Sequence, residues 1–261
     1  MANTEFRRFG FNPLTSRPVV TGLVPDRHII PVPAALLRKA SPLGIFYAGI
    51  ARWGNAFSDD IGPLFEAYVG RQLALMAAAT VLPAITYKAG AEGVDWIVIF
   101  DELVLLVEVK PTRPVEAVRL GGQAAGEALT QAVRKAVLQV DRTAGLIRDG
   151  HPAFAAVPND RPLAALMVTM EPFFGANMPS MDTWVSRPSI PARFCSAHEL
   201  ESLVTLQDDI PGLLMEHMTG QQTAGWSIQS LLSGKPLGPN PIMDAGAAVL
   251  PWSTAVLKDI A

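Results

Sequence analysis

Residues 93–110 constrain the fold of this chain more than any other part of the sequence. They read GVDWIVIFDELVLLVEVK, so that two runs rich in β-branched and large apolar residues, 94–100 and 103–110, flank the pair Asp101 and Glu102. Two such runs separated by two polar residues are typical of a β-hairpin whose polar pair forms the tight turn. The sequence therefore predicts an antiparallel hairpin, with residues 94 and 110 near its open end.

Three charged residues fall at the predicted open end of this hairpin: Asp95 on the first strand, and Glu108 and Lys110 on the second. Residues two apart share one face of a strand, and the pairing places Asp95 across from the other two. Burial of unpaired charge is costly, which indicates that these residues serve a purpose. Two close carboxylates suit a hard divalent cation such as Mg²⁺. A neighbouring lysine can orient an attacking water or neutralise charge on a phosphate.

The order of these residues resembles that of the PD-(D/E)xK nuclease superfamily, which includes type II restriction enzymes. Asp95 is followed by twelve residues and then by Glu108, Val109 and Lys110, while Val94 stands where a proline is usual. The resemblance implies an α/β fold, with a restriction-endonuclease-like αβββαβ core around a central mixed sheet. It also implies a nuclease that hydrolyses DNA phosphodiester bonds with Mg²⁺ or Mn²⁺. Asp95 and Glu108 would hold the metal, and Lys110 would position the attacking water.

A helix is predicted before the hairpin, around the sequence GPLFEAYVGRQL. Ser58 is a suitable N-cap for it, and Pro63 falls in its first turn, where proline is tolerated. Many members of the superfamily carry a further metal-binding glutamate on this helix, and the matching residue is Glu66. Glu66 flanks the apolar stripe of the helix, a position that can reach the end of the sheet. The alternative for Glu66 is an ordinary solvated helix residue.

A second, long helix is predicted after the hairpin, over residues 126–147. In several branches of the superfamily a glutamine on this helix contacts the metal-bound water or the DNA, and the candidates here are Gln131 and Gln139. At about 100° per residue, Gln131 points away from the apolar face whereas Gln139 flanks it. Gln139 is therefore the predicted site residue, and a plain surface position is the alternative for both glutamines.

Two further strands complete the predicted core. Residues 81–87 precede the hairpin, and residues 163–170, LAALMVTM, are apolar enough for a strand buried in the sheet. The resulting order of helix, three strands, helix and strand matches the αβββαβ core. A long helix between the last two strands predicts that these strands run parallel.

The sequence predicts one enlarged domain in three segments. Residues 1–57 are rich in proline and are expected to form an irregular arm packed on the core. Residues 58–170 form the nuclease-like core. Residues 171–261 extend the same domain, first as a loop and then with helices around 198–206 and 210–218.

The charge of the chain argues against a broad nucleic-acid-binding surface, because the net charge is −3 and the pI is about 5.8. A local basic groove and a solvated helix face are alternative interpretations of the cations that follow the hairpin, which are Arg113, Arg119, Arg134, Lys135 and Arg142. Hydrophobic residues make up 49% of the chain, and the mean hydropathy is +0.26. We therefore expect a protein partner or a homodimer to cover apolar surface.

The sequence also indicates a cytoplasmic protein without a signal peptide, a membrane helix or a zinc site. The single Cys195 excludes an internal disulfide and fits a reducing compartment. The most apolar span, 73–85, is too short for a bilayer and contains Pro83. The four histidines lack the spacing of zinc ligands.

Three functions remain open at this stage. The first is the metal-dependent DNA nuclease, and an RNA-directed nuclease with the same site cannot be separated from it by sequence. The alternative from another class is a catalytically silent scaffold of the same fold, in a phage-related, defence or secretion-associated complex. The intact set of Asp95, Glu108 and Lys110 argues against that scaffold, because a degenerate site would tolerate the loss of one of them. A separate alternative for the motif itself is an exposed ion pair that arose by chance in a β-hairpin.

Overall fold

The computed structural model describes residues 13–111, 123–173, 176–179 and 187–249. The chain divides into two compact units, Met1–Asp60 and Ile61–Ala261. The described part of the first unit contains regular elements, which are α1 (Pro13–Ser16), β1 (Val20–Val24), β2 (Arg27–Ile29), α2 (Pro33–Ala40) and α3 (Pro42–Trp53). Strands β1 and β2 pair as an antiparallel hairpin.

These regular elements correct the prediction of an irregular N-terminal arm. Pro33 and Pro42, which suggested irregular structure, lie in the first turns of α2 and α3. Proline is tolerated there because its missing N–H has no partner within the helix and its fixed φ suits the first turn. The packing of this arm on the core stays a prediction.

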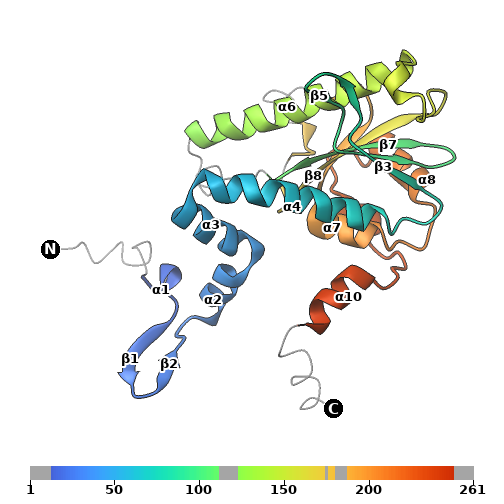
Figure 1. Ribbon diagram of the computed structural model, residues 1–261. Helices are drawn as coiled ribbons and strands as arrows, with labels where there is room; N and C mark the ends of the chain where they lie inside the picture. Colours follow the sequence, from blue (N-terminus) through green and yellow to red (C-terminus); the bar gives the residue numbers. More distant parts are fainter. Residues whose placement is uncertain (1–12, 112–122, 174–175, 180–186, 250–261) are drawn as a thin grey trace. The chain divides into compact units, whose positions relative to one another are not determined.

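The second unit is built on a five-stranded mixed sheet with the order β3-β6-β7-β8-β9 (Figure 1). Its strands are β3 (Thr80–Pro83), β6 (Trp96–Ile99), β7 (Val104–Lys110), β8 (Leu163–Thr169) and β9 (Ala192–Ser196). Strand β6 runs antiparallel to β3 and β7, whereas β7, β8 and β9 run parallel to one another. With α4 (Asn55–Leu73) before β3 and α6 (Gln123–Arg148) before β8, the predicted αβββαβ order of a mixed α/β fold is confirmed.

The central hairpin has the predicted register and turn. Trp96 on β6 lies opposite Val107 on β7. The N–H of Phe100 donates to the carbonyl of Leu103 at 2.9 Å, which closes the turn around Asp101 and Glu102. The crossover through α6 then brings β8 parallel to β7, with Lys110 opposite Thr169. The carboxyl ends of β7 and β8 therefore lie at the same edge of the sheet.

Three local predictions are wrong. The predicted strand 81–87 breaks after Pro83, and its second half, β4 (Thr86–Lys88), pairs with β5 (Ala91–Glu92) in a separate hairpin. Helix α4 begins at Asn55 instead of after a Ser58 cap. Pro63 consequently lies inside the helix and not in its first turn. The residues before Ser58 continue the helix, so no cap is needed there.

Strand β9 was not predicted, because its sequence ARFCS contains an arginine and follows a loop rich in proline. Arg193 is nevertheless only 8% exposed, and its Nη2 donates to the carbonyl of His217 at 3.0 Å. Up to residue 249, four helices follow β9, which are α7 (Ala197–Leu203), α8 (Ile210–Thr219), α9 (Ile228–Leu232) and α10 (Pro241–Ala248). The first two agree with the predicted helical segments. The side chains of Ser196 and Glu199 form a capping box at the start of α7.

Side chains close the outer edge of β9, the last strand of the sheet. Phe194 donates to Oδ1 of Asn177 at 2.8 Å and accepts from Nδ2 of the same amide at 3.1 Å. Arg193 Nη1 donates to the carbonyl of Ala192 at 3.0 Å, and the N–H of Ser196 donates to Glu199 at 2.8 Å. Four backbone groups that an edge strand usually leaves open are therefore bonded here, which are the carbonyl of Ala192, both groups of Phe194 and the N–H of Ser196.

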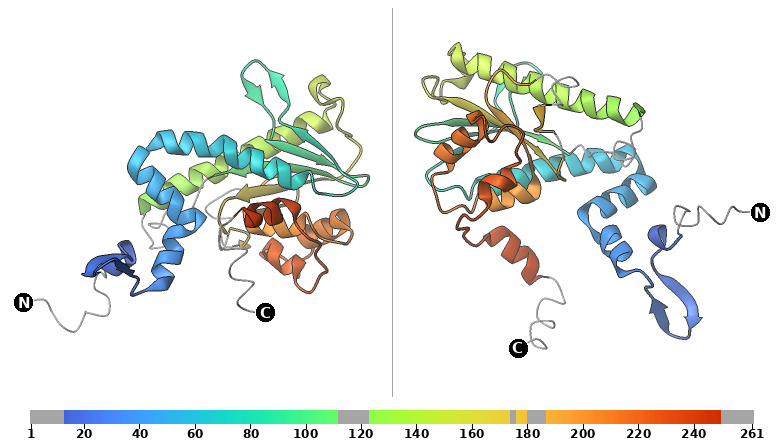
Figure 2. Two further views of the ribbon diagram at one scale, coloured as in Figure 1. Left: turned by 60° about the horizontal axis from the view of Figure 1, so that its bottom comes forward. Right: turned by 180° about the vertical axis from the view of Figure 1, so that it is seen from behind.

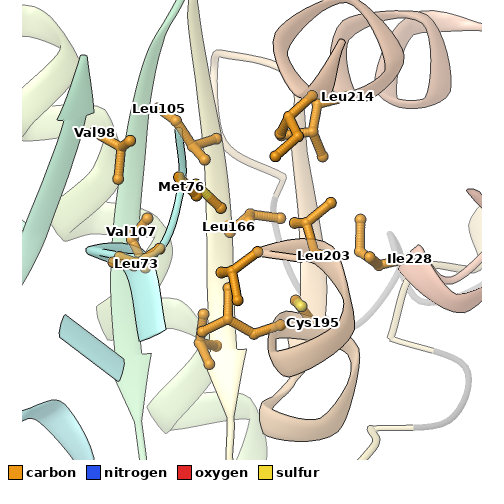
Figure 3. Packing of buried hydrophobic residues seen from close by; sticks show 14 of the residues in the cluster. Leu73, Met76, Val98, Leu105, Val107, Leu166, Cys195, Leu203, Leu214 and Ile228 are labelled. Atoms are coloured by element: carbon orange, nitrogen blue, oxygen red, sulfur yellow. The ribbon is translucent and has the colours of Figure 1, made fainter. Parts of the chain in front are cut away.

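Apolar side chains from the two faces of the sheet form two cores. One core joins Leu105 and Val107 to α4, α7, α8 and α9, and Figure 3 shows Leu73, Leu203 and Leu214 packed there. The other core joins Val104, Leu106 and Ile97 to α6. Figure 2 shows α6 and α7 on different sides of the sheet. Because side chains alternate along a strand, Glu108 and Lys110 belong with Val104 and Leu106 to the face that α6 covers.

Across the described ranges, every helix is too short or too polar to cross a bilayer.

Candidate active site

The carboxylate of Asp95 is tied to the backbone of the neighbouring strand. Asp95 comes directly before Trp96, which pairs with Val107, so Asp95 is level with Glu108. Its Oδ2 accepts a hydrogen bond from the N–H of Val109 at 2.6 Å. Val109 stands between Glu108 and Lys110, and this bond therefore brings the three predicted residues to one end of the hairpin.

Glu108 is a fully buried carboxylate, with 0% of the residue exposed. Its Oε1 accepts a hydrogen bond from Nζ of Lys110, whereas its Oε2 has no hydrogen-bond partner among the described residues. Burial, followed by the nearby Asp95 carboxylate, raises the pKa of Glu108 to about 8, although Lys110 acts in the opposite direction. A buried carboxylate oxygen without a partner is unfavourable, and the Lys110 ammonium pairs only with the other oxygen of Glu108.

Asp95 shares part of this electrostatic environment. Burial raises the pKa of Asp95, and the carboxylate of Glu92 adds to this effect. The hydrogen bond from Val109 and the ammonium of Lys110 oppose it. Two carboxylates whose charged forms are both disfavoured, placed at one strand end, form a site that favours a cation.

Lys110 joins the buried carboxylate to the solvent. It is the last residue of β7, and 25% of its side chain is exposed. Its ammonium bonds Glu108, while the exposed part of the side chain can meet a molecule that approaches the edge of the sheet. Lys110 is thus anchored on one side and accessible on the other.

Helix α4 brings Glu66 into the neighbourhood of the hairpin. The indole Nε1 of Trp96 donates to the carbonyl of Glu66 at 3.2 Å, and a Cβ on Gly70 would overlap the Trp96 ring. Burial raises the pKa of the Glu66 carboxyl, followed by the effects of Asp95 and Glu92, whereas Lys110 lowers it. Glu66 therefore interacts electrostatically with Asp95 and Lys110 of the central hairpin and with Glu92.

The described residues contain no group of three or more His, Cys, Asp and Glu side chains arranged to hold a metal ion. The structure brings Asp95 and Glu108 together and leaves Glu66 as a charged neighbour. Two carboxylates still fit a magnesium ion, which is often bound through one or two carboxylates and retained waters. The free Oε2 of Glu108 is an oxygen donor of the kind that this ion prefers.

Gln139 on α6 holds the backbone that leads into Asp95. Its Nε2 donates to the carbonyl of Gly93 at 2.7 Å. One turn later, Oγ1 of Thr143 accepts from the N–H of Val94 at 3.1 Å and donates to the carbonyl of Gln139 at 2.9 Å. Gln139 lies beside the site, as its flanking position predicted, but the described contact positions the chain. Gln131 is exposed.

Thr143 and Glu92 are not among the predicted site residues. The only sequence signal for Thr143 is one polar residue in the apolar stripe of the helix, four positions after Gln139. Glu92 precedes Asp95 by three residues, on a small hairpin that the sequence analysis did not predict. Its influence on Asp95 and Glu66 appears only when these elements are brought together in space.

No protein-family model and no curated protein sequence matches this chain. Among solved structures, the chain is similar to the small subunit of the heterodimeric restriction endonuclease R.BspD6I, with 13% sequence identity and a TM-score of 0.34. The match covers 60% of this chain and 79% of that subunit. At this degree of similarity the match assigns neither a family nor an activity.

Proposed function

We propose that this protein is a metal-dependent nuclease that hydrolyses the phosphodiester bonds of DNA. The observation that carries the proposal is the hydrogen bond from Val109 to Asp95, which gathers Asp95, Glu108 and Lys110 at one sheet end. The buried Glu108 with its unpartnered Oε2 adds to the argument, because a cation bound at this oxygen would stabilise the ionised carboxylate. A chance ion pair on an exposed hairpin would not have these properties.

Asp95 and Glu108 would hold the magnesium or manganese ion, with Glu66 as a further candidate ligand. A bound divalent cation supplies Lewis-acid polarisation of the phosphate and lowers the pKa of water. The two carboxylates orient their oxygens through the bonds already described, from Val109 to Asp95 and from Lys110 to Glu108. Magnesium sites of this type leave room for substrate phosphate oxygens.

Lys110 would position the attacking water or donate a hydrogen bond to the scissile phosphate. Its ammonium is held by Glu108 and its side chain is partly exposed, so Lys110 can meet the substrate without a large rearrangement. A fixed positive charge beside the reacting phosphate stabilises the negative charge that develops there. Gln139 and Thr143 act through the backbone of Gly93 and Val94, and we assign them a positioning role.

The test is cleavage of linear, circular and single-stranded DNA by the purified chain, with magnesium or manganese. Lys110→Ala and Asp95→Asn are expected to abolish cleavage and to retain the circular dichroism spectrum of the wild type. The matched control is Lys235→Ala, which removes a lysine outside the proposed site. The Nζ of Lys235 lies 3.0 Å from Oδ2 of its partner Asp208. Cleavage by Lys110→Ala at the wild-type rate would rule out the proposed role of the lysine.

The same assay separates the alternatives. An RNA substrate is run in parallel. Cleavage of RNA but not of DNA would support the proposed catalytic residues and show that the substrate is RNA. Absence of cleavage on every substrate with either metal would overturn the proposal and favour the scaffold function. A protein partner or a second copy of the chain stays a prediction, which the molar mass of the purified protein in solution tests directly.

A further inference from the structure

A groove lies beside the candidate site, between helix α6 and the small hairpin of β4 and β5. Figure 1 shows these two elements as neighbours. Its volume is about 640 Å³. Lys135, Gln139 and Arg142 line it from the helix, and Tyr87 and Glu92 line it from the hairpin. The hairpin is not part of the central sheet, so forming one wall of this groove is a role that the core fold does not require.

The groove and the candidate site share one residue. Gln139 lines the groove and also donates its Nε2 hydrogen bond to the carbonyl of Gly93, two residues before Asp95. Glu92, on the opposite wall, directly precedes Gly93 in the chain. A polymer that lies in the groove would therefore continue toward the carboxylates at the end of the central hairpin.

The helix wall of the groove is positively charged. Lys135 and Arg142 are seven residues apart, which is about two turns or roughly 10 Å along the same side of a helix. Arg142 donates from Nη1 to the hydroxyl of Tyr87 at 3.3 Å, a neutral partner that leaves its charge uncompensated. In the described parts of the chain, no ion pair joins Lys135 or Arg142 to a carboxylate. Glu92 is the one carboxylate among the lining residues.

We infer that this groove binds the sugar-phosphate backbone of the nucleic acid that enters the site. The inference rests on the proposed function for its biological role, but binding can be measured without cleavage. Lys135 and Arg142 would contact phosphates, and the Tyr87 hydroxyl would provide a further hydrogen bond. Their spacing corresponds to roughly three base steps of one duplex strand, at about 3.4 Å of helix axis per step.

The groove also distinguishes among the cations that the sequence offered for nucleic-acid binding. Lys135 and Arg142 line it, whereas Arg134, next to Lys135 on the same helix, does not. Arg113 and Arg119 lie outside the described residues. A negative net charge for the whole chain is compatible with this arrangement, because only a local pair of cations has to face the phosphates.

The experiment measures fluorescence anisotropy of a short fluorescein-labelled DNA, in duplex and single-stranded form, across a series of salt concentrations. EDTA prevents cleavage, and a repeat with magnesium uses the Lys110→Ala background. The double variant Lys135→Ala/Arg142→Ala is compared with Arg134→Ala/Arg148→Ala, which removes the same charge from exposed positions of the same helix outside the groove. Both variants thus have equal net charge.

The groove variant is expected to lose about eightfold in duplex affinity for each lost phosphate contact at 0.1 M salt. Its slope of log affinity against log salt should fall by roughly two, and the control variant should keep the wild-type slope. Equal losses in both variants, unchanged binding by the groove variant, or no binding by the wild type would each overturn the inference.

The outcome for the groove is distinguishable from the outcome for the proposed function. If the protein binds nucleic acid through the groove but cleaves none, the inference about the groove is supported and the proposed nuclease function is ruled out. If the groove variant cleaves in a metal-dependent way with an unchanged KM, the nuclease function is supported and the inference about the groove is ruled out.

Discussion

The N–H of Val109 donates a hydrogen bond to the Asp95 carboxylate at 2.6 Å, so one side chain both joins two strands and supplies a ligand to the proposed site. Structural and catalytic contributions of Asp95 can be separated, because asparagine retains an oxygen acceptor whereas alanine does not. The hydrogen bond and the charge are therefore tested by different substitutions.

We expect Asp95→Asn to be at least as stable as the wild type, since burial disfavours the charged carboxylate. Asp95→Ala leaves the Val109 N–H without this partner and should be about 1–3 kcal/mol less stable than Asp95→Asn. Urea denaturation gives the two free energies of unfolding. Equal stability of the two variants would show that the hydrogen bond contributes nothing, and both should be inactive in the cleavage assay.

The stability of the metal-free protein should decrease as the pH rises. The pKa of Glu108 is raised from 4.5 to about 8, so between these values the folded state retains a proton that the unfolded state has lost. The free energy of unfolding then falls by up to about 1.4 kcal/mol per pH unit. The stabilising contribution of the protonated Glu108 is fully present below the lower pKa and is lost as the pH rises to the upper one. Denaturation in EDTA should show this slope for the wild type relative to Glu108→Gln. The same pH profile in both proteins would contradict it.

Magnesium should counteract this loss, because a cation favours the ionised carboxylate. Binding requires a deprotonated ligand, so the increase in melting temperature caused by magnesium should be larger at pH 8 than at pH 6. Differential scanning fluorimetry measures this increase, and EDTA should reverse it. An increase of equal size in Glu108→Gln would place the ion elsewhere.

Thr143 is expected to matter for stability through its hydroxyl. Thr143 is fully buried, and Thr143→Val would leave the N–H of Val94 without its partner, at a cost of about 1–3 kcal/mol. Thr143→Ser keeps the hydroxyl and loses only a methyl group, which should cost about 0.8 kcal/mol. If Thr143→Val has a larger free energy of unfolding than Thr143→Ser in chemical denaturation, the hydrogen bond to Val94 does not explain the stabilising effect of Thr143.

The hairpin and its charged residues could be predicted because their signals are local. Alternating and apolar runs define the strands, and a two-residue turn determines the register that brings Asp95 level with Glu108. The α6 crossover and the buried β8 were predictable from length and hydropathy for the same reason. The prediction of Glu66 as a site residue was less local. It depended on the resemblance to the nuclease superfamily and on how the separate helix α4 packs against the hairpin.

What the sequence could not predict depends on contacts between distant residues. Arg193 is a charged residue in a buried strand, and the carbonyl that accepts from it belongs to His217, 24 residues later. Gln139 acquires its role from the Gly93 carbonyl, 46 residues earlier. Nothing in the local pattern around these residues reports such partners, because hydrogen bonds to backbone carbonyls do not depend on the identity of the partner side chain.

The packing of α4 on the hairpin gives a further prediction. A methyl group at Gly70 would overlap the Trp96 ring, so Gly70→Ala should reduce the free energy of unfolding by about 1–3 kcal/mol. The matched control is Gly145→Ala in α6, where an added Cβ meets no atom within 4 Å. That variant should be neutral or up to about 1 kcal/mol more stable, since alanine favours helix over glycine. Similar effects of both substitutions in urea would contradict the close contact.

The side chains that close β9 limit how a second chain can associate with this edge of the sheet. An exposed strand edge is a template on which a second chain can add a strand, either in a specific complex or in an aggregate. At Phe194 both backbone groups are already bonded to Asn177, so an incoming strand would first have to displace that amide. A homodimer or partner complex would therefore form through side-chain surfaces and not by continuation of the sheet at this edge, which also protects the protein from edge-to-edge aggregation.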